Sequence, residues 1–88
     1  LKLIRNYKIF YGLDTIEKII NRWAPPNENK TDAYINFVSK YTGYQPDTVI
    51  NVYKREQMII IAAAITLQEN GHDYKVNMSD INKGWDLL

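Results

Sequence analysis

The sequence predicts an all-α protein: a small orthogonal bundle of four to five short helices around a central apolar helix. Two observations lead to this prediction. Apolar residues recur at i, i+3, i+4 and i+7 in segments 16–23 and 34–41, which is the spacing of one helix face. Segment 58–65 is instead apolar nearly all round, so neighbouring helices must cover it on several sides.

The length and composition indicate a single helical domain over residues 1–88. Hydrophobic residues make up 45% of the chain and charged residues 24%, as in ordinary globular proteins. The chain opens at Leu1 without a Met, so we expect a piece of a longer protein. Cysteine is absent, which excludes disulfides and thiolate chemistry. The net charge of +1 argues against a strong overall attraction to nucleic acid, and the longest apolar run, 58–67, is too short to span a bilayer.

The first two helices are predicted at the N-terminal end of the chain. Apolar residues recur at three- and four-residue spacing over 1–11, and Gly12 is typical of a helix stop. Asp14 is the predicted N-cap of the second helix, with Glu17 three positions on, as in a capping box. Pro25 ends that helix, because the residue before a proline avoids helical backbone angles.

Three helices are predicted in the rest of the chain. The third begins near Thr31 and ends at Gly43. Segment 44–53 is rich in β-branched residues and interrupted by a proline, which favours a loop with at most one helical turn. The central apolar helix covers 54–69, and Ser79 is the predicted N-cap of the last helix.

The C-terminal end of the central helix is the first candidate site. Ala62 and Thr66 share a helix face with Glu69, and Arg55 lies on that face by the same count. A carboxyl group there meets the negative end of the helix dipole and partial desolvation, which both favour its protonated form. A protonated carboxyl group is what general-acid cleavage of a glycosidic bond requires. The alternative is an ordinary polar last turn with Glu69 in solvent.

The turn "NRWAPPNENKTDAY" (21–34) is the second candidate site. It offers an aromatic ring and several hydrogen-bonding groups, from Trp23, Asn27, Glu28, Asn29 and Tyr34. This combination suits sugars, because their rings stack on aromatic faces while amides pair with their hydroxyls. The alternative is a structural turn with Trp23 in the core, since Trp23 continues the apolar stripe of 16–20.

Two weaker patterns concern metals and nucleic acid. His72 is the single histidine, and a metal site needs several ligands at suitable spacing, so no metal or organic cofactor is predicted. Lys2, Arg5 and Lys8 share a face of the first helix. The near-zero net charge indicates a solvated face there, so no nucleic-acid partner is predicted.

Several segments resemble a known family. "YGLDTIEKIINRWAPPNENKTDAYINFVSKYTG" (11–43), "AITLQENGHDY" (64–74) and 81–84 resemble small phage and prophage virion structural proteins related to lysozyme-like lytic transglycosylases. The Asn- and Pro-rich lead-in of that family is missing, so the chain corresponds to the C-terminal part of such a domain. "LQENG" (67–71) is similar to the sequence around the catalytic acid of lysozyme-like enzymes, with Asn70 where serine is usual.

The resemblance implies a lysozyme-like fold and a site that acts on peptidoglycan, in the bacterial envelope or the phage virion. The catalytic acid would be Glu69, with Glu28 in reserve. The sugar cleft would be lined by Trp23, Asn27, Asn29, Tyr34 and Thr66. The alternative is a non-catalytic virion structural or cell-wall-binding module, and a small DNA-binding domain is a third hypothesis.

Overall fold

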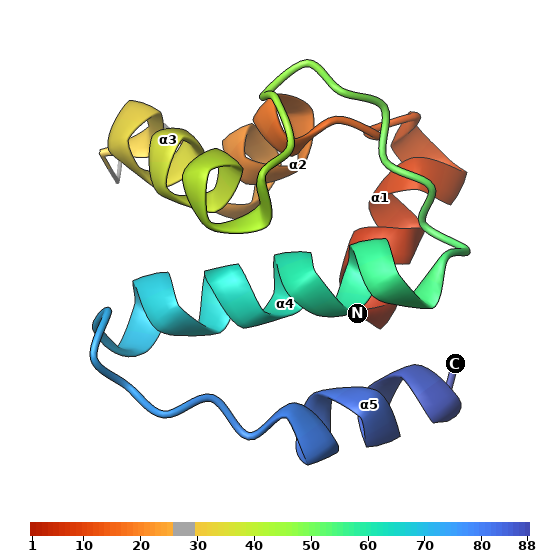
Figure 1. Cartoon of the computed structure of the whole chain (residues 1–88). Coiled ribbons are helices and arrows are strands. Elements are labelled where there is room, and N and C mark those ends of the chain that lie inside the picture. Colours follow the sequence, from red (N-terminus) through yellow and green to blue (C-terminus); the bar gives the residue numbers. More distant parts are fainter. Residues whose placement is uncertain (26–29) are drawn as a thin grey trace.

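The computed structural model describes residues 1–25 and 30–88, which form five helices (Figure 1). They are α1 (Lys2–Tyr11), α2 (Ile16–Trp23), α3 (Thr31–Thr42), α4 (Arg55–Asn70) and α5 (Met78–Asp86). Within the described ranges there is no strand, only an isolated antiparallel bridge between Thr15 and Val49. The predicted all-α bundle of short helices is confirmed.

Helix α4 is the centre of the bundle. It lies between α3 on one side and α5 on the other (Figure 1). Met58, Ile61 and Ala64 are each at most 1% exposed. Because neighbours cover α4 on several sides, it is apolar nearly all round, as the sequence predicts.

Helices α2 and α3 pack against each other and α3 packs against α4. The predicted stripe of α2 is confirmed, since Ile16, Ile19 and Ile20 are fully buried. The predicted stripe of α3 is confirmed at Tyr34 and Val38, which are buried, but Tyr41 is exposed and Ile35 is buried instead. The reason is tertiary, because the face that α3 buries is set by where α2 and α4 lie.

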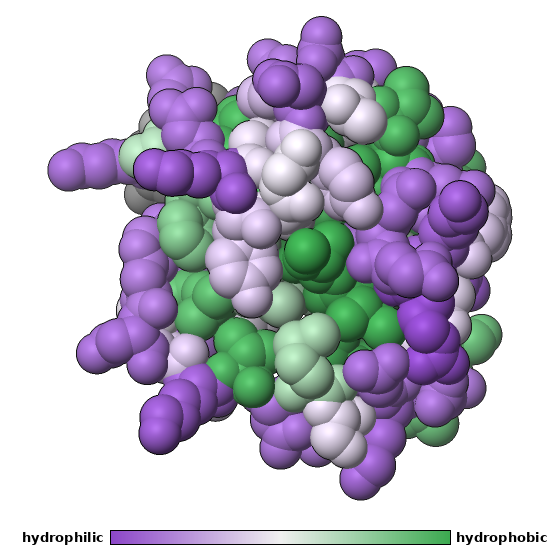
Figure 2. Space-filling view, in the orientation of Figure 1, coloured by the Kyte–Doolittle hydropathy of each residue, from purple (hydrophilic) through white to green (hydrophobic). Residues whose placement is uncertain are grey.

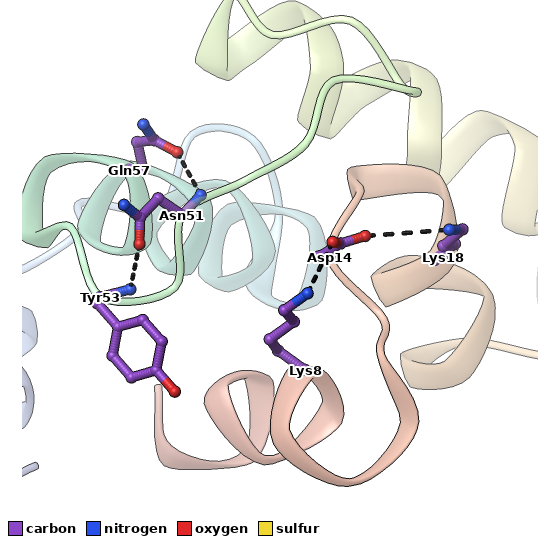
Figure 3. A network of polar contacts seen from close by, with 6 residues as sticks. All are labelled: Lys8, Asp14, Lys18, Asn51, Tyr53 and Gln57. Carbon is purple, nitrogen blue, oxygen red and sulfur yellow. Dashed lines mark hydrogen bonds and ion pairs between the residues drawn. The ribbon is translucent and has the colours of Figure 1, made fainter.

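The corner between α1 and α2 is held by polar contacts (Figure 3). Asp14 was the expected cap of α2, but the cap is Thr15, whose Oγ1 accepts a hydrogen bond from the Lys18 N–H at 3.1 Å. The Asp14 carboxylate instead accepts a hydrogen bond from Lys8 Nζ at 3.0 Å and lies 3.9 Å from Lys18 Nζ. The hydrogen bond from Lys8 and the charges of both lysines hold the Asp14 pKa below its ordinary value. Gly12 makes the sharp exit from α1 in the left-handed conformation, with φ 66°.

The segment between α3 and α4 is a loop, as predicted, and backbone hydrogen bonds join it to α2 and to Asp14 just before α2. The Glu17 N–H donates to the Pro46 carbonyl at 3.0 Å, and the Ile50 N–H donates to the Asp14 carbonyl at 2.6 Å. Figure 3 shows Asn51 linked to Gln57 at the end of this loop. The loop therefore covers part of the hydrophobic core, and its buried Ile50 belongs to that core.

Helix α5 is attached differently, since none of its residues is buried. Its cap is Asn77, not the predicted Ser79. Two guanidinium groups lie over the Trp85 ring. That of Arg5 is 5.1 Å from the ring centroid, and that of Arg55 is 6.0 Å from the ring centroid. Arg55 also donates to Asn82 at 2.8 Å and pairs with Asp86. Arg55, predicted to share a face with Glu69, therefore turns towards α5 at the opposite end of α4.

The surface in the view of Figure 1 is apolar in the middle and hydrophilic around it (Figure 2). This apolar area lies over α4 and extends towards α5. Among the described helices, none combines the length and the apolarity that crossing a bilayer requires.

Candidate functional site

Glu69 lies in the last turn of α4 beside a pocket of about 290 Å³. Ala62 and Thr66 line the same pocket, so the helix face predicted from their spacing is the face that meets it. The described lining residues come from α4, the end of α2 and the start of the chain: Leu1, Ile4, Trp23, Ala62, Ile65, Thr66, Glu69 and Asn70. We call this the Glu69 pocket.

Trp23 brings the end of α2 to the Glu69 pocket. Its indole Nε1–H donates a hydrogen bond to Glu69 Oε1 at 3.1 Å. The buried side of α2 fixes this position, and the Ala24 N–H continues the helical bonding to Ile20 O at 2.7 Å. Thr31 Oγ1 then donates to the buried Ala24 carbonyl at 2.6 Å and ties the start of α3 to the end of α2. The end of α2 and the acidic end of α4 therefore meet, although 46 residues separate Trp23 from Glu69.

Tyr34, which lies in α3, contacts the same carboxylate of Glu69. Its hydroxyl donates to Glu69 Oε1 at 2.9 Å, and the residue is only 6% exposed. Burial, and then the hydrogen bond to Glu69 and its negative charge, raise the pKa of the Tyr34 hydroxyl above its ordinary value. The hydroxyl therefore keeps its proton at neutral pH and donates it to the hydrogen bond. Tyr34 was expected to contact sugar; its side chain is buried and its hydroxyl contacts Glu69, and a contact with sugar stays a prediction.

The remaining predicted residues divide into two groups. Thr66 lines the Glu69 pocket, and its Oγ1 donates to the Ala62 carbonyl of its own helix at 2.8 Å. The other predicted residues of the turn, Asn27, Glu28 and Asn29, lie outside the described residues.

The sequence interpretation missed the part that α1 plays. Leu1 and Ile4 form one side of the Glu69 pocket. The spacing of apolar residues over 1–11 predicted a helix with an apolar face, but periodicity within one helix carries no signal of which other helices that face meets. Asn70 was noted only as the residue where serine is usual in lysozyme-like enzymes; its Nδ2 donates to Thr66 O at 2.8 Å, and it lines the pocket.

The other candidates have structural explanations. His72 stacks on Phe37 with ring centroids 3.8 Å apart, and its Nε2 lies 2.8 Å from Gln68 Oε1. In the described part of the chain, no three His, Cys, Asp or Glu residues are grouped so as to hold a metal ion. Of the basic residues on α1, Arg5 lies over the Tyr53 and Trp85 rings, and Lys8 is paired with Asp14.

Comparison with known proteins gives one informative similarity. No protein-family model matches the chain, and no solved structure matches it. The chain is 36% identical over 85 residues to Protein P5 of Pseudoalteromonas phage PM2. This alignment covers 97% of the chain but 51% of Protein P5, so the chain spans about half the length of that relative. The chain is thus similar to a phage protein, while the lysozyme-like relation stays a prediction.

Proposed function

We propose that this chain is a non-catalytic module of a phage or prophage virion protein, and that its Glu69 pocket binds the glycan strands of peptidoglycan. The similarity to a phage protein supports the virion setting. The observation that carries the glycan proposal is the hydrogen bond from Trp23 to Glu69, which places an aromatic residue and an exposed carboxylate at one pocket.

The chemistry of the Glu69 pocket suits a sugar ring. Leu1, Trp23 and Ala62, which are half-buried, supply an apolar surface for the C–H face of the ring. Glu69 and Asn70 are exposed at the edge, where they accept and donate hydrogen bonds to hydroxyl groups. The volume of about 290 Å³ is at the low end for ligand sites, so the pocket would hold one sugar unit of a longer strand.

Cleavage of the strand is the second candidate function, and the fixed position of Glu69 favours it. In a transglycosylase-like reaction, Glu69 would give its proton to the glycosidic oxygen as the bond to the anomeric carbon breaks. A hydroxyl of the same sugar would attack that carbon and return its proton to the carboxylate. One carboxyl group suffices for this scheme, and Glu69 is the one acidic residue among the described residues that line the pocket.

Binding is the better supported of the two functions. It needs only a carboxylate that accepts hydrogen bonds, which is how Glu69 interacts with Trp23 and Tyr34. Cleavage needs in addition a proton on Glu69 at the moment of reaction.

The test uses the full-length protein with purified cell walls, measuring both pelleting on the walls and loss of turbidity. We expect the wild type to pellet without clearing, and Glu69→Gln to pellet less because it loses the charged acceptor. Glu56→Gln is the matched control, since Glu56 is an exposed acid in the first turn of the same helix. Clearing by the wild type that Glu69→Gln abolishes would establish the second function. Unchanged pelleting of Glu69→Gln would refute the role of the pocket.

A further inference from the structure

A second and larger hollow lies on the other side of α2. It has a volume of about 830 Å³ and is formed where the end of α1, the exposed side of α2 and the 47–49 loop meet. Its described lining includes Tyr11, Leu13, Glu17, Arg22, Asp47 and Val49. We call it the α1–α2 groove. Its volume is within the range of about 300–1,000 Å³ that is usual for small-molecule sites.

The groove leaves large apolar side chains in water. Tyr11 is 61% exposed and Val49 is 67% exposed, and both border the groove together with Leu13. Exposed apolar side chains that gather at a concave surface are typical of a binding site. The apolar part of a ligand would therefore lie against these residues.

The groove also carries charges of both signs. The guanidinium of Arg22 lies 4.9 Å from the Tyr11 ring centroid, which holds it in place and leaves its N–H edge for a carboxylate. Glu17 and Asp47 have exposed side chains that form no ion pair with the described residues. Asp14 differs, because Lys8 and Lys18 already neutralise it (Figure 3).

This charge pattern selects the class of ligand. A polyanion such as nucleic acid would be repelled by Glu17 and Asp47, and a basic peptide would be repelled by Arg22. Arg22 already lies over the Tyr11 ring, which disfavours stacking of a sugar on that face. A short peptide that has a free carboxylate for Arg22, an ammonium group for Glu17 or Asp47, and small apolar side chains matches these groups of the groove.

We propose that the α1–α2 groove binds the peptide stem of peptidoglycan, which has these features. The source of the peptide rests on the proposed function, because the stem is attached to the glycan strand assigned to the Glu69 pocket. Arg22 and Trp23 are consecutive residues of α2, and one lines the groove while the other lines the pocket. The end of α2 thus lies between the groove and the pocket. A glycan strand in the pocket and the peptide stem attached to that strand would therefore meet at the end of α2.

The test is a nitrogen-15 NMR titration of the full-length protein with two probes. One probe is a synthetic stem tetrapeptide that contains diaminopimelate, and the other is a glycan strand stripped of its peptides. We expect the tetrapeptide to shift the Arg22 Nε–H signal and leave the Trp23 indole signal unchanged. We expect the stripped strand to do the opposite, with the Trp85 indole as an internal reference for both.

Variants test the charges. Arg22→Gln and Asp47→Asn should each weaken tetrapeptide binding about tenfold, the scale of one lost charge-assisted contact. Lys75→Gln should change it less than twofold, because Lys75 is exposed and is not among the described residues that line the groove.

Two results would overturn the proposal. They are the absence of an Arg22 shift at millimolar tetrapeptide, and equal binding of the tetrapeptide by both charge variants and the wild type. Failure of the stripped strand to move the Trp23 signal would count against the proposed function alone.

Discussion

The hydrogen bond between Tyr34 and Glu69 gives the sharpest test of the site geometry. Tyr34→Phe removes one hydroxyl from a residue that is 6% exposed and changes nothing else in the ring. The hydroxyl lies 2.9 Å from a carboxylate oxygen, and hydrogen bonds to charged groups contribute about 1.5–3 kcal/mol. Glu69 itself is exposed, so water screens the contact and the lower end applies. We expect a loss of about 1.5 kcal/mol, or about 6–12 °C in Tm for a domain of this size.

The assay is urea unfolding at pH 7, followed by circular dichroism. The midpoint should fall while the slope m stays constant, because the surface exposed on unfolding does not change. Tyr41→Phe is the matched control, since Tyr41 is exposed on the same helix, and its effect should stay within about 0.5 kcal/mol. A double-mutant cycle with Glu69→Ala should give a coupling of about 1 kcal/mol.

A different pattern would refute the reasoning. If Tyr34→Phe is as stable as Tyr41→Phe, or if its effect is the same with and without Glu69, the hydroxyl does not hold the carboxylate. The hydrogen bond from Tyr34 of α3 would then not fix the position of Glu69, and the proposals for the Glu69 pocket would lose their geometric basis.

Four further predictions concern pH, capping and the core. Because the Tyr34 pKa is raised, the folded state keeps a proton that the unfolded state loses, so stability should fall as pH rises above about 10. Alkaline unfolding curves of the wild type and Tyr34→Phe should therefore converge, and a constant gap would contradict this. The Asp14 pKa is lowered by Lys8, so its stabilising effect should be present above about pH 4 and disappear at lower pH. Asp14→Asn should flatten that acid decline in thermal melts. Thr15→Ala should cost about 1 kcal/mol at every pH, because it removes the cap of α2; no loss would mean that another group caps the helix. Ile20→Ala should cost about 2–5 kcal/mol in urea unfolding, since Ile20 is 0% exposed, and a cost below 1 kcal/mol would show that the core can collapse around the gap.

The sequence by itself determined the helices. Periodicity and the glycines after α1 and α3 predicted four to five short helices and their approximate ends, because these signals act over one or two helical turns. It also placed Ala62, Thr66 and Glu69 on one face, since helical geometry alone relates them. The caps were harder: Asp14 and Thr15 are adjacent and both suit the role, and the choice depended on Lys8, which comes from another helix.

The tertiary structure decided which elements meet. Nothing within α3 shows that Tyr34 donates to Glu69 of α4, or that Ile35 is buried while Tyr41 is not. Nothing within α1 shows that Ile4 borders the Glu69 pocket, or that Tyr11 supports the Arg22 guanidinium. Periodicity reports which side of a helix is apolar, whereas the partner of that side depends on packing between residues far apart in the chain. Both sites lie where separate helices meet, which is why local sequence signals could name some of their residues but could not assemble them.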